Sequence, residues 1–294
     1  IIKKINLKIK TLTKKQINFF QNKFILNNIL GKTKSVNFDG LSIDTRTIKR
    51  DNLFLAIKGK KNDGERFIGN ALKKGAGCIV SSSIKKNRKK IIKIKNKISF
   101  LNQFARLKRD KTLAKIIAIT GSAGKTSLKN IIKDLLLNFG KTFSSPKSFN
   151  NHLGVPISLS NLNYDYKYGV FEVGMSKAKE IKNLTKLIKP HIGLITNIGE
   201  AHIENFKNIS EIAKAKSEII EHIETGGTII LNRDDKFFKF LFKKAKRFGI
   251  KIFTFGKNKK ANVSVRKIIK MGDKSKIFIN INKKKINFII KDLN

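Results

Sequence analysis

The sequence predicts an α/β protein, with a small N-terminal α/β domain followed by a larger domain built on a doubly wound, mostly parallel sheet. Short apolar runs alternate with helical stretches over most of the chain, which is typical of parallel sheets. Near the middle, a glycine-containing turn joins an apolar run to a helical stretch. A length of 294 residues is sufficient for two domains with buried cores.

The charge balance is strongly basic, with 65 Lys and Arg against 20 Asp and Glu and a net charge of +45 at pH 7. The lysines are spread over the whole chain with abundant Ile, Asn and Phe, which an AT-rich coding sequence would favour. No basic stripe interleaved with aromatic residues is present, so we expect no specific nucleic-acid partner. Non-specific binding to polyanions at low salt is still expected.

The single cysteine, Cys78, excludes an intramolecular disulfide and suits a reducing compartment. No apolar stretch approaches 18 residues, and no signal peptide is visible. We therefore expect a cytoplasmic protein without a membrane span. We also expect a monomer, although no residue pattern reports the oligomeric state.

The first elements alternate between strand and helix. Residues 1–10 begin with alternating Ile and Lys, which indicates a strand, and a helix over 14–30 is ended by Gly31. Further strands are predicted at 53–57 and within 75–80, with a helix between them.

A basic segment closes this part of the chain. Residues 84–99 are predicted to form a solvated loop that ends in a strand, and a short helix is predicted over 101–108. Because the polar Arg109-Asp-Lys-Thr follows, we divide the chain there into domains of 1–110 and 111–294.

A polar cluster lies between apolar runs of the first domain. It contains Ser42, Asp44, Thr45 and Arg46. These residues could hold the phosphates or the uridine of a ligand, or could form a surface turn. Residue types alone favour the turn.

Residues 115–128 are the most informative stretch of the chain. Ile116 to Ile119 form a short apolar run that predicts a buried parallel strand. Gly121 and Gly124 permit a tight turn, and the next residues begin a helix with apolar side chains at helical spacing. Gly140 supplies the end of that helix.

A strand, a glycine turn, Gly-Lys-Thr and a helix together form an apparatus that holds a nucleoside triphosphate. Backbone N–H groups face the phosphates, Lys125 adds a cation, and the Thr126 hydroxyl reaches Mg²⁺. The first glycine of the common P-loop pattern is replaced by Ile119. The residues predicted to bind ATP or GTP are Gly121, Ser122, Ala123, Gly124, Lys125, Thr126 and Ser127.

The rest of the chain continues the alternation of strands and helices. Strands are predicted at 169–174, 192–196, 228–231 and 252–255. Helices are predicted from Ser176 to 189 and from Ser210 to 223, each with its serine as the N-cap. A β-rich appendage extends to residue 294.

Two residues of the second domain stand in unusual places. Glu172 lies inside an apolar strand, where an unpaired carboxylate would be costly. His202 follows the end of another strand. Because ligands of open α/β sheets bind beyond the carboxyl ends of the strands, both residues are expected on the P-loop side, where they can bind a cation.

Lys216 falls inside an apolar helical stripe. The stripe consists of Ile212, Ile219 and Ile223, and a lysine buried among them is costly unless it is neutralised or modified. Its ammonium group could reach the surface instead. The alternative is that the amine becomes a carbamate, an anion able to bind a metal.

Six motifs in order resemble those of the Mur ligases of peptidoglycan synthesis. They are Thr120-Gly-Ser-Ala-Gly-Lys-Thr-Ser, Phe149-Asn-Asn-His-Leu-Gly-Val-Pro, Glu172-Val-Gly-Met-Ser, Thr196-Asn-Ile-Gly-Glu-Ala-His-Ile-Glu, Ala213-Lys-Ala-Lys-Ser-Glu-Ile and Leu231-Asn-Arg-Asp-Asp. The resemblance covers nearly the whole chain. Within the family, the paired Asn150-Asn151 and Glu-x-Gly-x-Ser favour the branch that adds D-alanyl-D-alanine.

The resemblance implies an ATP-dependent ligase that joins D-Ala-D-Ala to UDP-MurNAc-tripeptide through an acyl phosphate. By similarity, Lys125 steadies the β- and γ-phosphates, and Thr126 and Glu172 bind one Mg²⁺. His202 and carbamylated Lys216 would hold a second Mg²⁺ near the acyl phosphate. The catalytic residues implied are therefore Lys125, His202 and Lys216.

The other site residues implied by the resemblance contact adenosine or the UDP-linked substrate. Near adenosine they are Asn232 and Asp235. At the substrate they are Ser42, Asp44, Arg46, Asp63, Gly64, Asn150 and Asn151.

Mur ligases have a third, Rossmann-like domain that closes over ATP and the incoming amine. This chain ends at Asn294, about where that domain would begin, so we expect the chain alone to bind nucleotide but to ligate weakly or not at all. Three alternatives remain open. The first is a relative with another acceptor, such as the ligase that adds a diamino acid or a folate polyglutamate synthase. The others are a non-catalytic ATP-binding module and a nucleic-acid-dependent NTPase.

Overall fold

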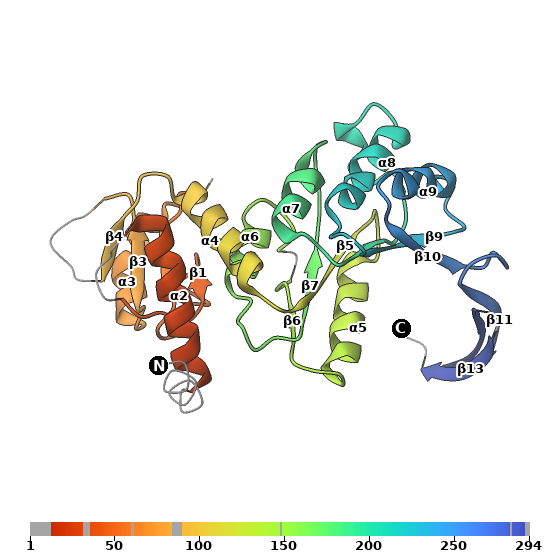
Figure 1. The fold of residues 1–294 in the computed structure, drawn as a ribbon, viewed down its shortest axis with the longest axis horizontal. Coiled ribbons are helices and arrows are strands. Elements are labelled where there is room, and N and C mark those ends of the chain that lie inside the picture. The colour runs from red at the N-terminus through yellow and green to blue at the C-terminus, as the bar shows by residue number, and fades with distance from the viewer. Residues whose placement is uncertain are drawn as a thin grey trace. The chain divides into compact units, whose positions relative to one another are not determined.

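The computed structural model divides the chain into two compact units (Figure 1). Unit 1 contains residues 1–114 and 153–167, and unit 2 contains residues 115–152 and 168–294. The structure describes residues 13–31, 36–59, 62–83, 90–147, 149–282 and 284–291. The strand predicted over 1–10 and part of the predicted basic loop, residues 84–89, lie outside the described residues.

Unit 1 is built on a four-stranded parallel sheet with the order β1-β2-β3-β4. Its strands are β1 (Leu41–Ser42), β2 (Leu53–Leu55), β3 (Cys78–Ser81) and β4 (Ile91–Lys93). Its helices are α2 (Lys14–Leu30), the 3₁₀ helix η1 (Gly64–Phe67), α3 (Ile68–Lys73), α4 (Lys97–Lys111) and α6 (Gly154–Ser160).

The helix predicted over 14–30 is confirmed as α2, which begins at a capping box formed by Thr13 and Gln16. The helix predicted over 101–108 is longer, because the Asn96 side chain accepts a hydrogen bond from the Ser99 N–H and starts α4 earlier.

Unit 1 includes an excursion of the chain, residues 153–167, that the sequence-based division into 1–110 and 111–294 did not contain. Helix α6 of this excursion is buried along its whole length. The Asn161 amide that follows it accepts from the Leu41 N–H and donates to the Leu41 carbonyl, both at 2.9 Å. The excursion therefore completes the core of unit 1.

Unit 2 contains a nine-stranded sheet with the order β13-β12-β11-β10-β9-β8-β5-β7-β6. The strands from β6 to β11 in this order are parallel, and β11, β12 and β13 are antiparallel. The strands are β5 (Lys115–Thr120), β6 (Thr142–Ser144), β7 (Tyr168–Glu172), β8 (Ile192–Ile195), β9 (Thr228–Asn232), β10 (Lys251–Gly256), β11 (Val263–Met271), β12 (Lys274–Ile281) and β13 (Lys284–Lys291).

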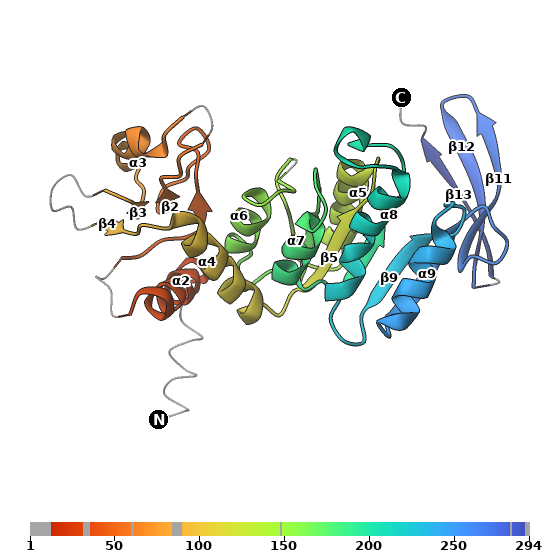
Figure 2. The same ribbon diagram turned by 90° about the horizontal axis from the view of Figure 1, so that it is seen from above.

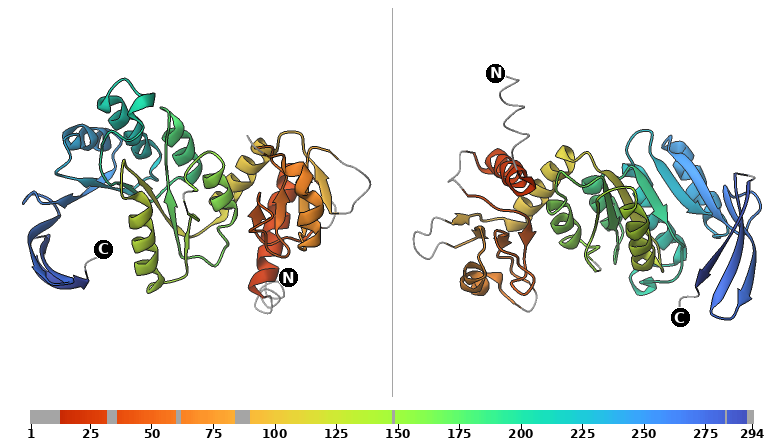
Figure 3. Two further views of the ribbon diagram at one scale, coloured as in Figure 1. Left: turned by 180° about the vertical axis from the view of Figure 1, so that it is seen from behind. Right: turned by 90° about the horizontal axis from the view of Figure 1, so that it is seen from below.

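Helices cover both faces of this sheet, as a doubly wound fold requires. They are α5 (Lys125–Leu137), α7 (Glu180–Ile188), η2 (Ile203–Asn205), α8 (Ile209–Ser217), η3 (Glu218–His222) and α9 (Phe238–Arg247). Helix α5 lies on one face, and α7, α8 and α9 lie on the other (Figures 2 and 3). The α/β fold with mostly parallel strands is therefore confirmed.

Strand β5 occupies the point where the strand order reverses. Its neighbours are β7 on one side and β8 on the other. Ile117 and Ile119 of β5 pack with apolar residues of α5, including Leu128 and Ile132. In open α/β sheets such a reversal creates a crevice at the carboxyl ends of the strands, and the residues after β5 lie there.

Two predicted helix starts are wrong. Helix α7 begins at Glu180 rather than after Ser176, because Lys179 has a left-handed backbone (φ +69°) and interrupts the helix. Helix α8 is capped by Asn208 rather than Ser210, because the extended Asn208 places its side chain where it accepts from the Glu211 N–H.

Among the residues that the structure describes, no helix combines the length and the apolar character needed to span a membrane.

Candidate active site

The turn between β5 and α5 has a shape that only glycine allows at one position. Gly121 has φ +148°, and a Cβ atom there would lie 1.8 Å from Oγ1 of Thr196. Gly124 has φ +79° and immediately precedes the first residue of α5, Lys125. The first turn of α5 thereby begins at the end of the central strand, which suits an anion-binding helix N-terminus.

The loop after β8 holds this turn in place. Ser122 Oγ donates to the Gly199 carbonyl (2.9 Å) and accepts from the Gly199 N–H (2.7 Å). The Ala123 N–H donates to Asn197 Oδ1 (3.0 Å), and Thr196 Oγ1 donates to the Ala123 carbonyl (2.7 Å). The P-loop is therefore fixed against the carboxyl end of a neighbouring strand.

Glu172 is the last residue of β7 and is only 2% exposed. Its Oε2 atom accepts from the Thr126 hydroxyl (2.7 Å), and its Oε1 atom accepts from Asn150 Nδ2 (2.8 Å). The Lys129 ammonium lies 3.9 Å from Oε2. These partners make the burial of a carboxylate tolerable, and the Thr126 and Glu172 oxygens are ligands of the type that Mg²⁺ prefers.

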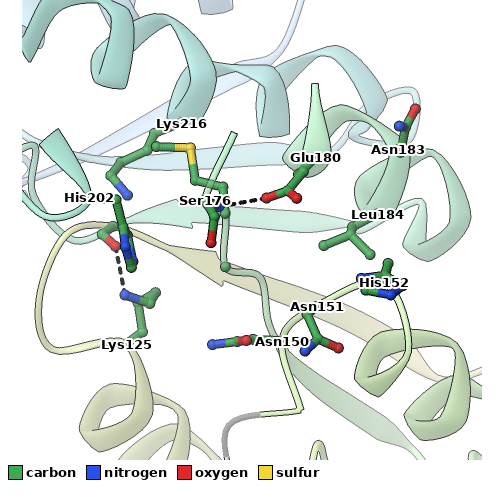
Figure 4. Close-up of a pocket in the computed structure, with 13 residues that line it drawn as sticks. Lys125, Asn150, Asn151, His152, Ser176, Glu180, Asn183, Leu184, His202 and Lys216 are labelled. Atoms are coloured by element: carbon green, nitrogen blue, oxygen red, sulfur yellow. Dashed lines mark hydrogen bonds between the residues drawn. The ribbon is translucent and has the colours of Figure 1, made fainter. Parts of the chain in front are cut away.

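A pocket of about 450 Å³ opens beside the P-loop (Figure 4). Its volume is in the range of small-ligand sites. It brings together six of the residues singled out from the sequence: Gly121, Lys125, Asn150, Asn151, His202 and Lys216.

Two lysines make one side of this pocket cationic. Lys125 Nζ donates to the Gly121 carbonyl (2.8 Å). Lys216 on α8 is 3% exposed, and Figure 4 shows its amine on the same side of the pocket as His202 and Lys125. Burial, and after it the charge of Lys125, lowers the pKa of Lys216 to about 8. The predicted burial of Lys216 is confirmed.

His202 has a left-handed backbone (φ +65°), and its side chain is half exposed. Its Nδ1 atom lies 3.8 Å from Oε1 of Glu204. In the part of the chain that the structure describes, no group of three or more His, Cys, Asp or Glu side chains is placed to hold a metal ion. The second Mg²⁺ site expected at His202 and Lys216 stays a prediction.

Helix α7 supplies further residues that the sequence analysis missed. Glu180 and Asn183 line the pocket, and Glu180 Oε2 accepts from the N–H groups of Ser176 (2.6 Å) and Lys177 (3.1 Å). The available signal was the acidic residue four positions after Ser176. Glu180 holds the turn that follows β7 and so shapes the pocket wall.

Asn150 differs in its contacts from its expected role at the substrate. Its amide donates to Glu172, and its backbone carbonyl accepts from the Gly174 N–H (2.8 Å). It therefore orients the carboxylate beside the P-loop. Asn151 lines the same pocket.

Asn232 and Asp235, expected near adenosine, shape the turn after β9. Asn232 Oδ1 accepts from the Asp234 N–H (3.0 Å). The Asp235 carboxylate accepts from the N–H groups of Ile198 (2.7 Å) and Phe237 (2.8 Å). Neither residue is among those described as lining the 450 Å³ pocket, so the adenosine contact stays a prediction.

Unit 1 has a pocket of its own, with a volume of about 430 Å³. Asp44, Arg46 and Gly64 line it. The Arg46 guanidinium donates to both carboxylate oxygens of Asp44 and lowers the pKa of that carboxyl group. At Gly64 a Cβ atom would lie 2.6 Å from the Ile57 carbonyl oxygen, so the chain passes too close for a side chain there.

Ser42 and Asp63 support this pocket without lining it in the described part of the chain. Ser42 Oγ accepts from the Asp44 N–H (3.1 Å) and donates to the Asp44 carbonyl (3.0 Å). Asp63 caps η1 by accepting from the Glu65 N–H (3.0 Å). Five of the seven residues predicted at the substrate thus belong to one neighbourhood of unit 1, whereas Asn150 and Asn151 line the pocket beside the P-loop.

Two family models match the sequence. The Mur ligase middle domain matches residues 119–291, and the model described as Mur ligase family, catalytic domain, matches residues 37–109. The chain belongs to the Mur ligase family. The resemblance stated from the six motifs is thereby confirmed.

Curated Mur ligases with similar sequences are named UDP-N-acetylmuramoyl-tripeptide–D-alanyl-D-alanine ligase. The one from Rickettsia prowazekii is 36% identical over 88% of this chain and 58% of its own length. The one from Buchnera aphidicola subsp. Acyrthosiphon pisum is 40% identical over 75% and 48%, and the one from Escherichia coli is 33% identical over 72% and 46%. The chain thus spans about half the length of these relatives.

Solved Mur ligase structures share the fold. MurF ligase from Thermotoga maritima in complex with ADP has a TM-score of 0.72 and 26% identity, covering 85% of this chain and 57% of that chain. MurF from Acinetobacter baumannii has a TM-score of 0.80 and 24% identity, covering 93% and 60%.

Proposed function

We propose that this chain is the ATP-binding and UDP-substrate-binding part of a ligase that joins D-Ala-D-Ala to UDP-MurNAc-tripeptide. The names of its relatives support this activity. The observation that carries it is the contact of Thr126 with Glu172, whose carboxylate also accepts from Asn150. Asn150 lines the same pocket as Lys125, His202 and Lys216.

The reaction has two steps. The terminal carboxylate of the tripeptide attacks the γ-phosphorus of ATP, and the bond to the bridging oxygen breaks to release ADP and leave an acyl phosphate. The D-Ala-D-Ala amine then adds to the acyl carbon, loses a proton, and the tetrahedral intermediate expels phosphate to give the amide. Both steps build negative charge on oxygen, which cations in a water-poor site stabilise.

The P-loop would hold the triphosphate. The backbone N–H groups at the start of α5 and the Lys125 ammonium offer positive potential to the β- and γ-phosphates. The Thr126 hydroxyl and the Glu172 carboxylate fit Mg²⁺ as hard oxygen donors, and Asn150 keeps the carboxylate oriented. When bound there, Mg²⁺ would neutralise phosphate charge and orient the phosphates for in-line transfer.

Lys216 and His202 would act at the acyl phosphate, because they line the pocket on the Lys125 side. The comparisons add no support for a carbamate at Lys216. Its support is the environment of the amine alone: with a pKa of about 8, roughly one molecule in ten carries the neutral amine at pH 7, and only the neutral amine reacts with CO₂.

The UDP end of the substrate would bind in the unit 1 pocket. The exposed Arg46 guanidinium, which Asp44 holds in place, is suited to a phosphate, and Gly64 lines the same pocket. Both features agree with the positions that the family resemblance implies.

A ligation assay tests the proposal. The protein as encoded in its genome should release phosphate from ATP only when UDP-MurNAc-tripeptide and D-Ala-D-Ala are both present, and a panel of other amines should be poor acceptors. Efficient use of a different amine or of a folate substrate would assign the chain to another branch of the family. Failure of the chain to bind ATP at all would refute the proposal.

A further inference from the structure

Lys129 is a buried lysine at the P-loop for which the proposed reaction has no role. It lies on α5, one turn beyond Lys125 and Thr126, and its side chain is 1% exposed. Lysine is among the residues least often fully buried, because its charge must be compensated. An aliphatic side chain would fill the same space at lower cost.

The Lys129 ammonium joins two segments that meet at Glu172. It donates to the backbone carbonyls of Ser145 (2.8 Å) and Lys147, which precede Asn150 in the chain. It also lies 3.9 Å from Glu172 Oε2, the atom that accepts from Thr126.

The same segment contacts Glu172 a second time. Ser145 Oγ accepts from the Glu172 N–H (3.2 Å), and Asn150 donates to Oε1 of the carboxylate. The carboxylate is therefore held by a hydroxyl, an amide and an ammonium group, and the ammonium is the cation among them. Groups that orient a metal ligand in this way commonly affect metal affinity as strongly as some ligands do.

We propose that Lys129 is a positioning residue for the magnesium–nucleotide site: it holds Glu172 and the segment leading to Asn150 in the arrangement that receives Mg²⁺ beside Thr126. The inference rests on the proposed function only in assuming that Thr126 and Glu172 bind Mg²⁺ with the nucleotide.

The direction of the change in Mg²⁺ affinity distinguishes a positioning role of Lys129 from a purely electrostatic one. Lys129 and Mg²⁺ are both cations, so loss of the Lys129 charge alone would strengthen Mg²⁺ binding. Loss of a group that orients the carboxylate would weaken it. If Lys129 is a positioning residue, its replacement should therefore raise the Mg²⁺ concentration that nucleotide binding requires.

The test uses the purified chain and a fluorescent ATP analogue, titrated with Mg²⁺ or with a chelator present. Lys129→Met should raise the Mg²⁺ concentration for half-maximal enhancement of binding about tenfold, with metal-free binding nearly unchanged. Lys133→Met is the matched control: it lies one turn further along α5, is partly exposed, and should behave as wild type. Lys129→Arg, which keeps the charge and the donors, should restore part of the Mg²⁺ response.

An unchanged or lowered Mg²⁺ requirement in Lys129→Met would overturn the proposal. If Lys129→Met does not fold, the double variant with Glu172→Gln removes both buried charges and should require the same Mg²⁺ concentration as Glu172→Gln alone. An additional loss in the double variant would show that Lys129 acts elsewhere. A wild-type chain that binds no nucleotide would refute the proposed function, whereas normal wild-type binding with an unaffected Lys129→Met refutes the positioning role alone.

Discussion

Two lysines, Lys216 and Lys108, are buried in different surroundings, and the surroundings decide what each can do. The Lys108 ammonium donates to the side-chain oxygens of Gln21 (3.1 Å) and Asn163 (3.3 Å), which ties three parts of unit 1 together. For the Lys216 amine, no hydrogen-bond acceptor is found among the described residues, and it lines a pocket. Lys108 is thus engaged within the fold, whereas Lys216 is available to a ligand or to CO₂.

Lys216 gives the first residue-level prediction. In the protein as encoded in its genome, Lys216→Ala should abolish ligation and leave ATP binding within about threefold of wild type, because the amine acts at the acyl phosphate and not at adenosine. With ¹³C-labelled bicarbonate, the wild type should show a carbamate NMR resonance that the variant lacks. Lys214→Ala, a change at an exposed neighbour paired with Glu211, is the control. Wild-type turnover by Lys216→Ala would leave both the catalytic role and the carbamate without support.

Lys108 gives a prediction about pH. Burial lowers its pKa from 10.5 to about 8, so between these pH values the unfolded chain binds more protons than the folded chain. The contribution of Lys108 to stability therefore rises as pH increases through this window, by up to about 3 kcal/mol. Relative to Lys108→Met, the wild type should gain free energy of unfolding as pH is raised from 7 towards 10.5, measured by urea denaturation. If the free energies of unfolding of the two proteins change with pH in parallel, the prediction is wrong.

At the scale of elements, the P-loop turn depends on the loop after β8. Gly121→Ala would place a Cβ atom 1.8 Å from Thr196 Oγ1, in a backbone conformation that alanine rarely adopts. We expect nucleotide binding to fall at least tenfold, since the N–H groups of the turn must move, as measured by isothermal titration calorimetry. Gly69→Ala in α3 is the control, because a Cβ atom at Gly69 would meet nothing within 4 Å. This variant should bind nucleotide like wild type. Unaltered binding by Gly121→Ala would mean that the turn does not hold phosphate.

The elements also show where local sequence is informative and where it is not. The P-loop strand, the burial of Lys216 and the buried strand containing Glu172 follow from periodicity, because apolar spacing reports burial directly. The starts of α7 and α8 cannot be predicted from periodicity. Lys179 adopts a left-handed conformation before α7, and Asn208 rather than Ser210 caps α8.

At the scale of the whole molecule, the rule for open α/β sheets allowed the candidate site to be anticipated. The rule places strand ends at one edge, and Glu172 does contact Thr126 there. Lys129 could not be found in this way, because a lysine on a helix is an ordinary surface feature in a sequence. The role of Lys129 appears only through its contacts with Ser145, Lys147 and Glu172.

The net charge of +45 gives a prediction at the same scale. The chain should be retained on a polyanion such as heparin at low ionic strength and be released steeply as salt is added. At physiological salt, DNA or RNA should leave ATP binding unchanged, because no basic stripe concentrates the charge. Nucleotide binding that depends on nucleic acid would favour a nucleic-acid-dependent NTPase instead.

The excursion of residues 153–167 means that the chain passes between the two units three times. Neither unit is therefore a contiguous segment that recombination could exchange with one crossover. A chimera that took residues 1–114 from another Mur ligase would keep the α6 segment of this chain. Asn161 and Asn163 would then face the other protein's residues at positions 41 and 108, in place of Leu41 and Lys108, with which they form hydrogen bonds here. Recombination within this family should thus be tolerated mainly when residues 1–114 and 153–167 are exchanged together, so these two stretches should be inherited as a pair.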